Sequence, residues 1–269
     1  MEYAREEEDV KAIVAIGSFT RADAKADEYS DLDLIIVTEK PEKWFLGECL
    51  EKFGNVSISF VEPTLGGGKE RRSIYDDDKD VDMIIFTPEQ FVNNLKSGVA
   101  QWIMNRGYYV MYESGGYTEI IKQYVSHIHS IPKMSETEYI NVVNDFYFHN
   151  IWACKKLRRG EVWAAKICVD SYLKNYLLKM IELYCFNQNG IDVWHDGRFL
   201  DKWADEDIIN ELKYCFAHYD SEDIMRALWA THNLFDRIAK AVSQTLGYKY
   251  PNDAKKCAEK YMAKGGSEE

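Results

Sequence analysis

Residues 17–21 read Gly17-Ser18-Phe19-Thr20-Arg21, and residues 30–37 read Ser-Asp-Leu-Asp-Leu-Ile-Ile-Val after a mostly polar loop. The apolar run from Leu32 predicts a strand, whose side chains alternate between the two faces of its sheet. Asp31 and Asp33 are therefore expected on one face, and their leucine neighbours on the other. Two carboxylates beside a Gly-Ser turn that can approach a phosphate closely indicate a site for Mg²⁺ and a nucleoside triphosphate.

A third carboxylate follows in residues 75–86, YDDDKDVDMIIF. This segment is interpreted as a strand end, an acidic turn and a new strand with Asp82 near its start. A Gly-Ser pair or an Asp-x-Asp pair alone is a weak signal, but GSxxR, SDLDL and a hairpin-borne VDMII in this order are specific. Their order resembles the DNA polymerase beta nucleotidyltransferase superfamily. The alternative is three solvated turn aspartates on an ordinary α/β domain.

Composition limits the classes of function. The chain has 269 residues, 46% of them hydrophobic and 29% charged, with a net charge of −12. This length is enough for one large or two modest domains. The acidic balance argues against a general nucleic-acid binder, which would present a basic face, and suits a cationic partner. No secretory signal and no apolar run long enough to cross a membrane is seen, and six scattered cysteines fit a reducing compartment. We therefore expect a cytoplasmic protein.

The pattern of apolar residues changes along the chain and predicts an α+β fold. Residues 1–133 are expected to form a polymerase beta-like nucleotidyltransferase domain, a mixed sheet with flanking helices. Residues 134–269 are expected to form a helical bundle that binds the acceptor. The expected strands are 10–17, 32–38, 56–61, 72–76 and 81–86. The expected helices are 41–53, 88–95, 135–159, opened by a Ser135–Glu138 capping box, 161–187, 204–218 and 222–246, capped by Ser221.

Motifs of the second half narrow the family. They are, in order, Asp145-Phe146-Tyr147, the segment GEVWAAK at 160–166 that starts the second helix, Leu178-Lys179-Met180, a Gly-Arg-Phe-Leu-Asp-Lys turn at 197–202, Leu234-Phe235 and Leu-Gly-Tyr-Lys-Tyr-Pro at 246–251. Together with the first half they resemble the aminoglycoside 6-adenylyltransferases, over almost the whole chain. This resemblance implies ATP, Mg²⁺ and transfer of AMP to an aminoglycoside hydroxyl.

The chain also departs from that family in two places. Only about nine residues precede Val10, so the helix that usually comes before the first strand is missing or very short. The family commonly has an arginine directly after Gly-Ser, where this chain has Phe19, and the basic residue is Arg21. These departures leave the exact acceptor open.

The predicted nucleotide site combines the turn with the carboxylates. Asp31 and Asp33 are expected to hold Mg²⁺. Gly17 is expected to let the backbone approach the phosphate closely, and the Ser18 hydroxyl and amide to donate to the phosphate oxygens. Arg21 is expected to contact the triphosphate tail, and the alternative for it is a surface ion pair with Asp23 or Asp27.

Four further residues are candidates for the chemistry. Asp82 completes a second metal site or acts as the base on the acceptor hydroxyl. Asp145 orients or deprotonates the acceptor, or is a solvated helix charge, and Glu62 is a weaker base candidate. Lys166 binds the nucleotide or is a surface lysine.

Three other functions are considered. The nearest is nucleotidylation of a lincosamide or another small-molecule hydroxyl. Protein- or RNA-directed nucleotidyltransferases of the toxin–antitoxin kind are usually shorter and lack such a helical domain. A non-catalytic binding protein with a decayed site is disfavoured because all three acidic positions are present. Monomer and homodimer both stay open.

Overall fold

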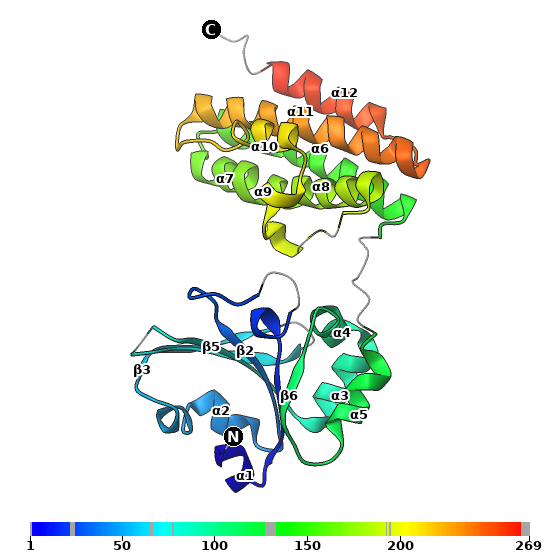
Figure 1. The fold of residues 1–269 in the computed structure, drawn as a ribbon. Coiled ribbons are helices and arrows are strands. Elements are labelled where there is room, and N and C mark those ends of the chain that lie inside the picture. The colour runs from blue at the N-terminus through cyan, green and yellow to red at the C-terminus, as the bar shows by residue number, and fades with distance from the viewer. Residues whose placement is uncertain are drawn as a thin grey trace. The chain divides into compact units, whose positions relative to one another are not determined.

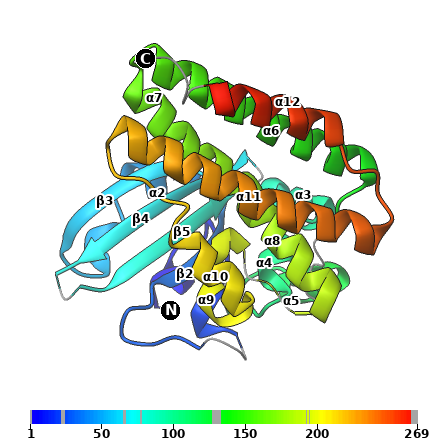
Figure 2. The same ribbon diagram turned by 90° about the horizontal axis from the view of Figure 1, so that it is seen from above.

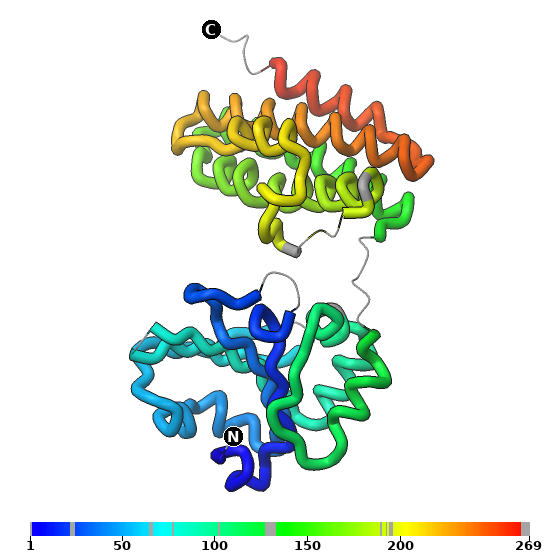
Figure 3. The backbone as a smooth tube through the Cα atoms, in the orientation of Figure 1, coloured from blue at the N-terminus to red at the C-terminus, as the bar shows by residue number. Residues whose placement is uncertain are grey.

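The structure is a computed structural model that describes residues 2–21, 25–64, 67–76, 78–126, 133–191, 193 and 195–264. The chain divides into two compact units, residues 1–130 and 131–269, and Figures 1 and 3 trace the backbone through each. The predicted boundary after residue 133 stays a prediction, because residues 127–132 lie outside the described residues.

A six-stranded sheet forms the centre of the first unit (Figure 1). Its strand order is β3-β4-β5-β2-β1-β6. β2 and β5 are parallel and the other neighbours are antiparallel, so the predicted mixed sheet is confirmed. The strands are β1 (Val10–Ala15), β2 (Leu32–Thr38), β3 (Val56–Pro63), β4 (Lys69–Tyr75), β5 (Asp80–Phe86) and β6 (Tyr109–Glu113). β6, a short edge strand, was not predicted from the sequence.

Alternation along the strands gives the sheet two apolar faces. Ile35 and Val37 pack with Phe91 on the face covered by α3 (Pro88–Ser97), α4 (Val99–Met104) and α5 (Tyr117–Tyr124). Ile36 and Met83 pack with Trp44 on the opposite face, which is covered by α1 (Glu2–Glu6) and α2 (Pro41–Leu46). The helix before the first strand is thus very short. The helix predicted over 41–53 is wrong in extent, since it ends at Leu46 and a separate 3₁₀ turn, η2, spans Leu50–Lys52.

The second unit is helical, as predicted. Ser135 and Glu138 form the predicted capping box at the start of α6 (Glu136–Arg158). The helix predicted over 161–187 runs through α7 (Val162–Ile167), a π-helical segment called η4 (Cys168–Tyr172) and α8 (Leu173–Asn189). The remaining helices are α9 (Leu200–Trp203), α10 (Glu206–Leu212), α11 (Ser221–Leu246) and α12 (Asn252–Ala263).

Three details of the second unit correct the sequence-based expectation. The helix predicted to reach residue 218 ends at Leu212. The cap of α11 is Asp220 and not Ser221, because the Asp220 carboxylate accepts from the amides of Glu222 and Asp223. The chain after Gly247 forms a further helix, α12, which lies along α6 (Figure 2).

Aromatic packing holds the helices of the second unit together. The rings of Phe146 on α6 and Phe235 on α11 stack at 3.6 Å between centroids. Tyr147 is buried, and its hydroxyl lies 3.2 Å from the Asp236 carboxylate. No helix within the described ranges is long and apolar enough to cross a membrane.

Candidate active site

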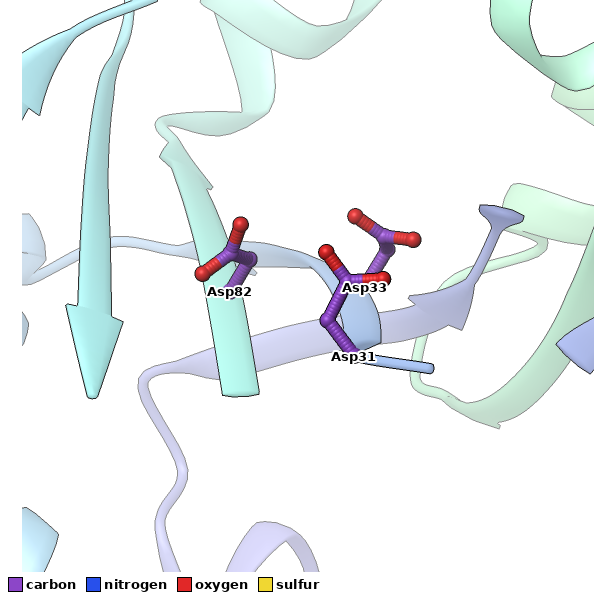
Figure 4. A group of neighbouring side chains, drawn as sticks. All are labelled: Asp31, Asp33 and Asp82. Atoms are coloured by element: carbon purple, nitrogen blue, oxygen red, sulfur yellow. The ribbon is translucent and has the colours of Figure 1, made fainter. Parts of the chain in front are cut away.

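Three carboxylates converge where β2 and β5 begin, namely those of Asp31, Asp33 and Asp82 (Figure 4). One oxygen of each lies within 4.8 Å of one oxygen of the other two. The parallel ladder causes this, since it pairs Asp33 directly with Asp82. Asp82 is buried and the other two are half-buried. The same three residues were grouped on the basis of the sequence, and the structure brings them together.

The Gly-Ser turn lies against this group. Residues Gly17–Phe19 form a 3₁₀ turn, η1, after β1, and Gly17 has φ +69°. A Cβ atom on Gly17 would lie 1.9 Å from Asp33 Oδ2, so only glycine permits this approach. The Ser18 hydroxyl is buried and has no hydrogen-bond partner among the described residues. A hydroxyl in that state is available to a ligand such as a phosphate oxygen.

Arg21 follows the turn directly. The segment before it packs against the loop that leads into β6, where a Cβ atom on Gly107 would lie 2.3 Å from the Thr20 carbonyl oxygen. The absence of a side chain at Gly107 therefore allows this close approach just before Arg21. The alternative ion pair with Asp23 falls outside the described residues.

Two residues of β4, Arg72 and Glu70, were not singled out from the sequence. Arg72 lies opposite Asp82 in the β4–β5 ladder. Its Nε is 3.4 Å from Asp82 Oδ2, 2.9 Å from Glu70 Oε1 and 2.8 Å from Glu62 Oε1. The hairpin register could have indicated this row of residues. Glu62, the weaker base candidate, thus forms an ion pair beside the three aspartates.

Burial controls the proton affinity of Asp82. Removal from water raises the pKa of this carboxyl to about 7, the Arg72 guanidinium opposes the rise and Glu70 adds to it. Asp82 Oδ1 is buried without a hydrogen-bond partner in the described part of the chain. An unsatisfied buried oxygen beside two more carboxylates fits a divalent cation that prefers hard oxygen ligands, such as Mg²⁺.

The other two predicted site residues belong to the second unit. The Asp145 carboxylate on α6 accepts a hydrogen bond of 3.0 Å from the Tyr172 hydroxyl, and His149 Nδ1 lies 2.7 Å from it. The Lys166 ammonium on α7 forms an ion pair with Asp170. Asp145 is therefore tied to neighbouring side chains of its own unit.

The mixed sheet, the glycine turn and the strand carboxylates are those of a nucleotidyltransferase, and the chain is an enzyme of this class. It belongs to the streptomycin adenylyltransferase family, whose sequence model matches residues 1–264. The chain is 21% identical over 266 residues to the aminoglycoside 6-adenylyltransferase of Bacillus subtilis (strain 168), covering 94% of this chain and 90% of the relative.

A solved structure shares the fold. It is the crystal structure of an aminoglycoside 6-adenyltransferase from Bacillus subtilis, with a TM-score of 0.50 and 18% sequence identity. The match covers 99% of this chain and 95% of that one.

Proposed function

We propose that this enzyme transfers AMP from ATP to a hydroxyl of an aminoglycoside of the streptomycin type, with Mg²⁺, and releases pyrophosphate. The convergence of Asp31, Asp33 and Asp82 beside the Gly17-Ser18 turn carries the proposal. Membership of the streptomycin adenylyltransferase family and a relative named as an aminoglycoside 6-adenylyltransferase support it. Such a reaction would confer antibiotic resistance.

The proposed reaction is in-line attack of an alcohol on the α-phosphorus, which demands charge neutralisation and positioning. Asp31, Asp33 and Asp82 would hold the Mg²⁺, whose charge offsets that of the phosphate oxygens. The Gly17 backbone and the Ser18 hydroxyl would hydrogen-bond the β- and γ-phosphate oxygens, and Arg21 would contact the triphosphate tail.

The acceptor hydroxyl must lose its proton. Asp82 is one candidate base, a role that would take the place of its role as a metal ligand. Asp145 is the other candidate, or orients the acceptor. Lys166 would have to exchange its Asp170 partner for a phosphate in order to bind the nucleotide.

Charge supports a cationic acceptor. The net charge is −12, and Asp76 and Asp78 in the turn before β5 are followed by Asp80, the first residue of that strand. An acidic rim raises the local concentration of a polycation. We infer a cytoplasmic enzyme, monomeric or homodimeric, that does not act on nucleic acids.

The deciding experiment is pyrophosphate release with ATP and Mg²⁺ across streptomycin, other aminoglycosides and a lincosamide. We expect turnover with streptomycin and its loss in Asp31→Asn and Asp33→Asn, while Asp253→Asn, at an exposed aspartate of α12, serves as the control. Titration with Mn²⁺, followed by electron paramagnetic resonance, should show weaker binding in the first two variants only.

The outcomes separate the parts of the proposal. Turnover of the lincosamide but not of any aminoglycoside would replace the acceptor class and keep the nucleotidyltransferase chemistry. Turnover near that of the wild type in Asp31→Asn or Asp33→Asn would refute the metal site.

A further inference from the structure

A cluster of polar and aromatic side chains lies on one face of the second unit, around Asp145. On α6, Asp145 and His149 are four residues apart and share a face. Tyr172 and Tyr176 have the same spacing on the adjoining stretch of η4 and α8. The Tyr172 hydroxyl lies 3.0 Å from Asp145 Oδ1 and 3.2 Å from the Tyr176 hydroxyl. We call these four residues the Asp145 cluster.

The rings of the cluster lie close to one another. The His149 and Tyr172 rings are 4.2 Å apart between centroids, and those of Tyr172 and Tyr176 are 5.1 Å apart. The cluster is open to solvent, since the side chain of Asp145 is 29% exposed and Tyr172 is 36% exposed. The carboxylate is therefore held in place and remains accessible.

The hydrogen-bonding capacity of the cluster is only partly used. The Tyr172 and His149 contacts both end on Asp145 Oδ1, and the Tyr176 hydroxyl also interacts with this carboxylate, whose two oxygens can accept further hydrogen bonds. A tyrosine hydroxyl that donates a hydrogen bond can also accept one through the lone pairs of its oxygen. The cluster thus presents several acceptors and aromatic rings around one negative charge.

The backbone beneath Tyr172 is unusual. Cys168–Tyr172 is a π-helical segment within an otherwise α-helical stretch, a feature that often marks functional sites. The ammonium of Lys174 supports the segment from inside, donating to the Val169 carbonyl and the Thr231 hydroxyl at 2.8 Å each. Burial lowers the pKa of Lys174 to about 8, so keeping the ammonium charged at this buried position costs free energy.

We propose that Asp145, Tyr172 and Tyr176 form a subsite for a protonated amine or guanidinium group of the acceptor. The inference rests on the proposed function and adds the residues that recognise the cation. A cationic nitrogen donates charge-assisted hydrogen bonds to the Asp145 carboxylate and the tyrosine hydroxyls, and the rings add a cation–π attraction. The role of His149 is positional, because it holds Asp145 Oδ1.

The test measures binding without nucleotide or metal, so it does not depend on catalysis. Calorimetric titrations of the full-length protein use streptomycin and two fragments, a diguanidinocyclitol and a diaminocyclitol. The variants are Tyr172→Phe, Tyr176→Phe and Asp145→Asn, with Tyr214→Phe as the control because Tyr214 is an exposed tyrosine of the same unit.

We expect Tyr172→Phe and Tyr176→Phe each to weaken streptomycin binding about five- to tenfold, and Asp145→Asn to weaken it more than thirtyfold. Tyr214→Phe should bind as the wild type does. The preferred fragment identifies guanidinium or amine as the recognised group. In turnover assays the variants should raise the KM for streptomycin and leave the KM for ATP unchanged, a split that general loss of structure would not produce.

Two results would overturn the inference. One is wild-type affinity for streptomycin in Asp145→Asn and Tyr172→Phe. The other is that the wild type binds neither streptomycin nor a fragment. Failure of the proposed function looks different, since the wild type would then bind the cation through the cluster but release no pyrophosphate with any aminoglycoside.

Discussion

Replacing Gly17 with alanine should disable the site while leaving the fold nearly intact. The new Cβ atom would lie 1.9 Å from Asp33 Oδ2, whereas ordinary contact begins at 3.4 Å. The carboxylate therefore has to withdraw by about 1.5 Å, the difference between these distances. A misplacement of about 1 Å at a reacting centre can cost about a hundredfold in rate, so we expect kcat to fall at least that far.

The stability of Gly17→Ala should change much less. A residue other than glycine at φ +69° costs about 1–2 kcal/mol of backbone strain. Gly116→Ala is the matched control, because Gly116 has φ +78° and a Cβ there meets nothing within 4 Å. Pyrophosphate release, Mn²⁺ titration and urea unfolding are measured for both variants. If Gly17→Ala retains turnover within about threefold of Gly116→Ala, the close approach of turn and carboxylate does not matter for catalysis.

Three further predictions concern charge. Arg72→Gln should lower the free energy of unfolding by about 1–2 kcal/mol in urea titrations, because it leaves buried Glu70 without its cation. The effect stays this small because the Arg72 side chain is 44% exposed and solvent screens its charge. An unchanged urea midpoint would contradict this. Burial raises the pKa of the Glu182 carboxyl to about 7, and the negative charge of Asp196 adds to the rise. The stability that the protonated carboxyl contributes is therefore fully present below about pH 4.5 and is lost as the pH rises to about 7. Glu182→Gln should therefore be more stable than the wild type at pH 8 and equally stable at pH 4. The same difference in stability at both pH values would refute the raised pKa of Glu182. The KM for streptomycin should rise with KCl more steeply than the KM for Mg·ATP, because salt screens exposed charges over about 8 Å; parallel slopes in steady-state assays would argue against an acidic acceptor site.

Local patterns were enough to predict much of the fold. The strand that starts at Leu32 and the Ser135 capping box are encoded by neighbouring residues, and the structure has both where the sequence placed them. Elements with weaker local signals were missed. β6 has only five residues at the edge of the sheet, and no helix was predicted over the residues of α12.

The sequence by itself determined which residues form the carboxylate group, because alternation along a strand places Asp31 and Asp33 together and the hairpin order adds Asp82. Only the tertiary structure decided their surroundings. Arg72 reaches Asp82 through the pairing of β4 with β5, and Tyr172 reaches Asp145 through the packing of two helices. Burial, which raises the pKa of Asp82, likewise depends on residues distant in sequence. Sequence periodicity specifies the face on which a side chain lies, whereas its partners and its exposure to water depend on which elements pack against that face.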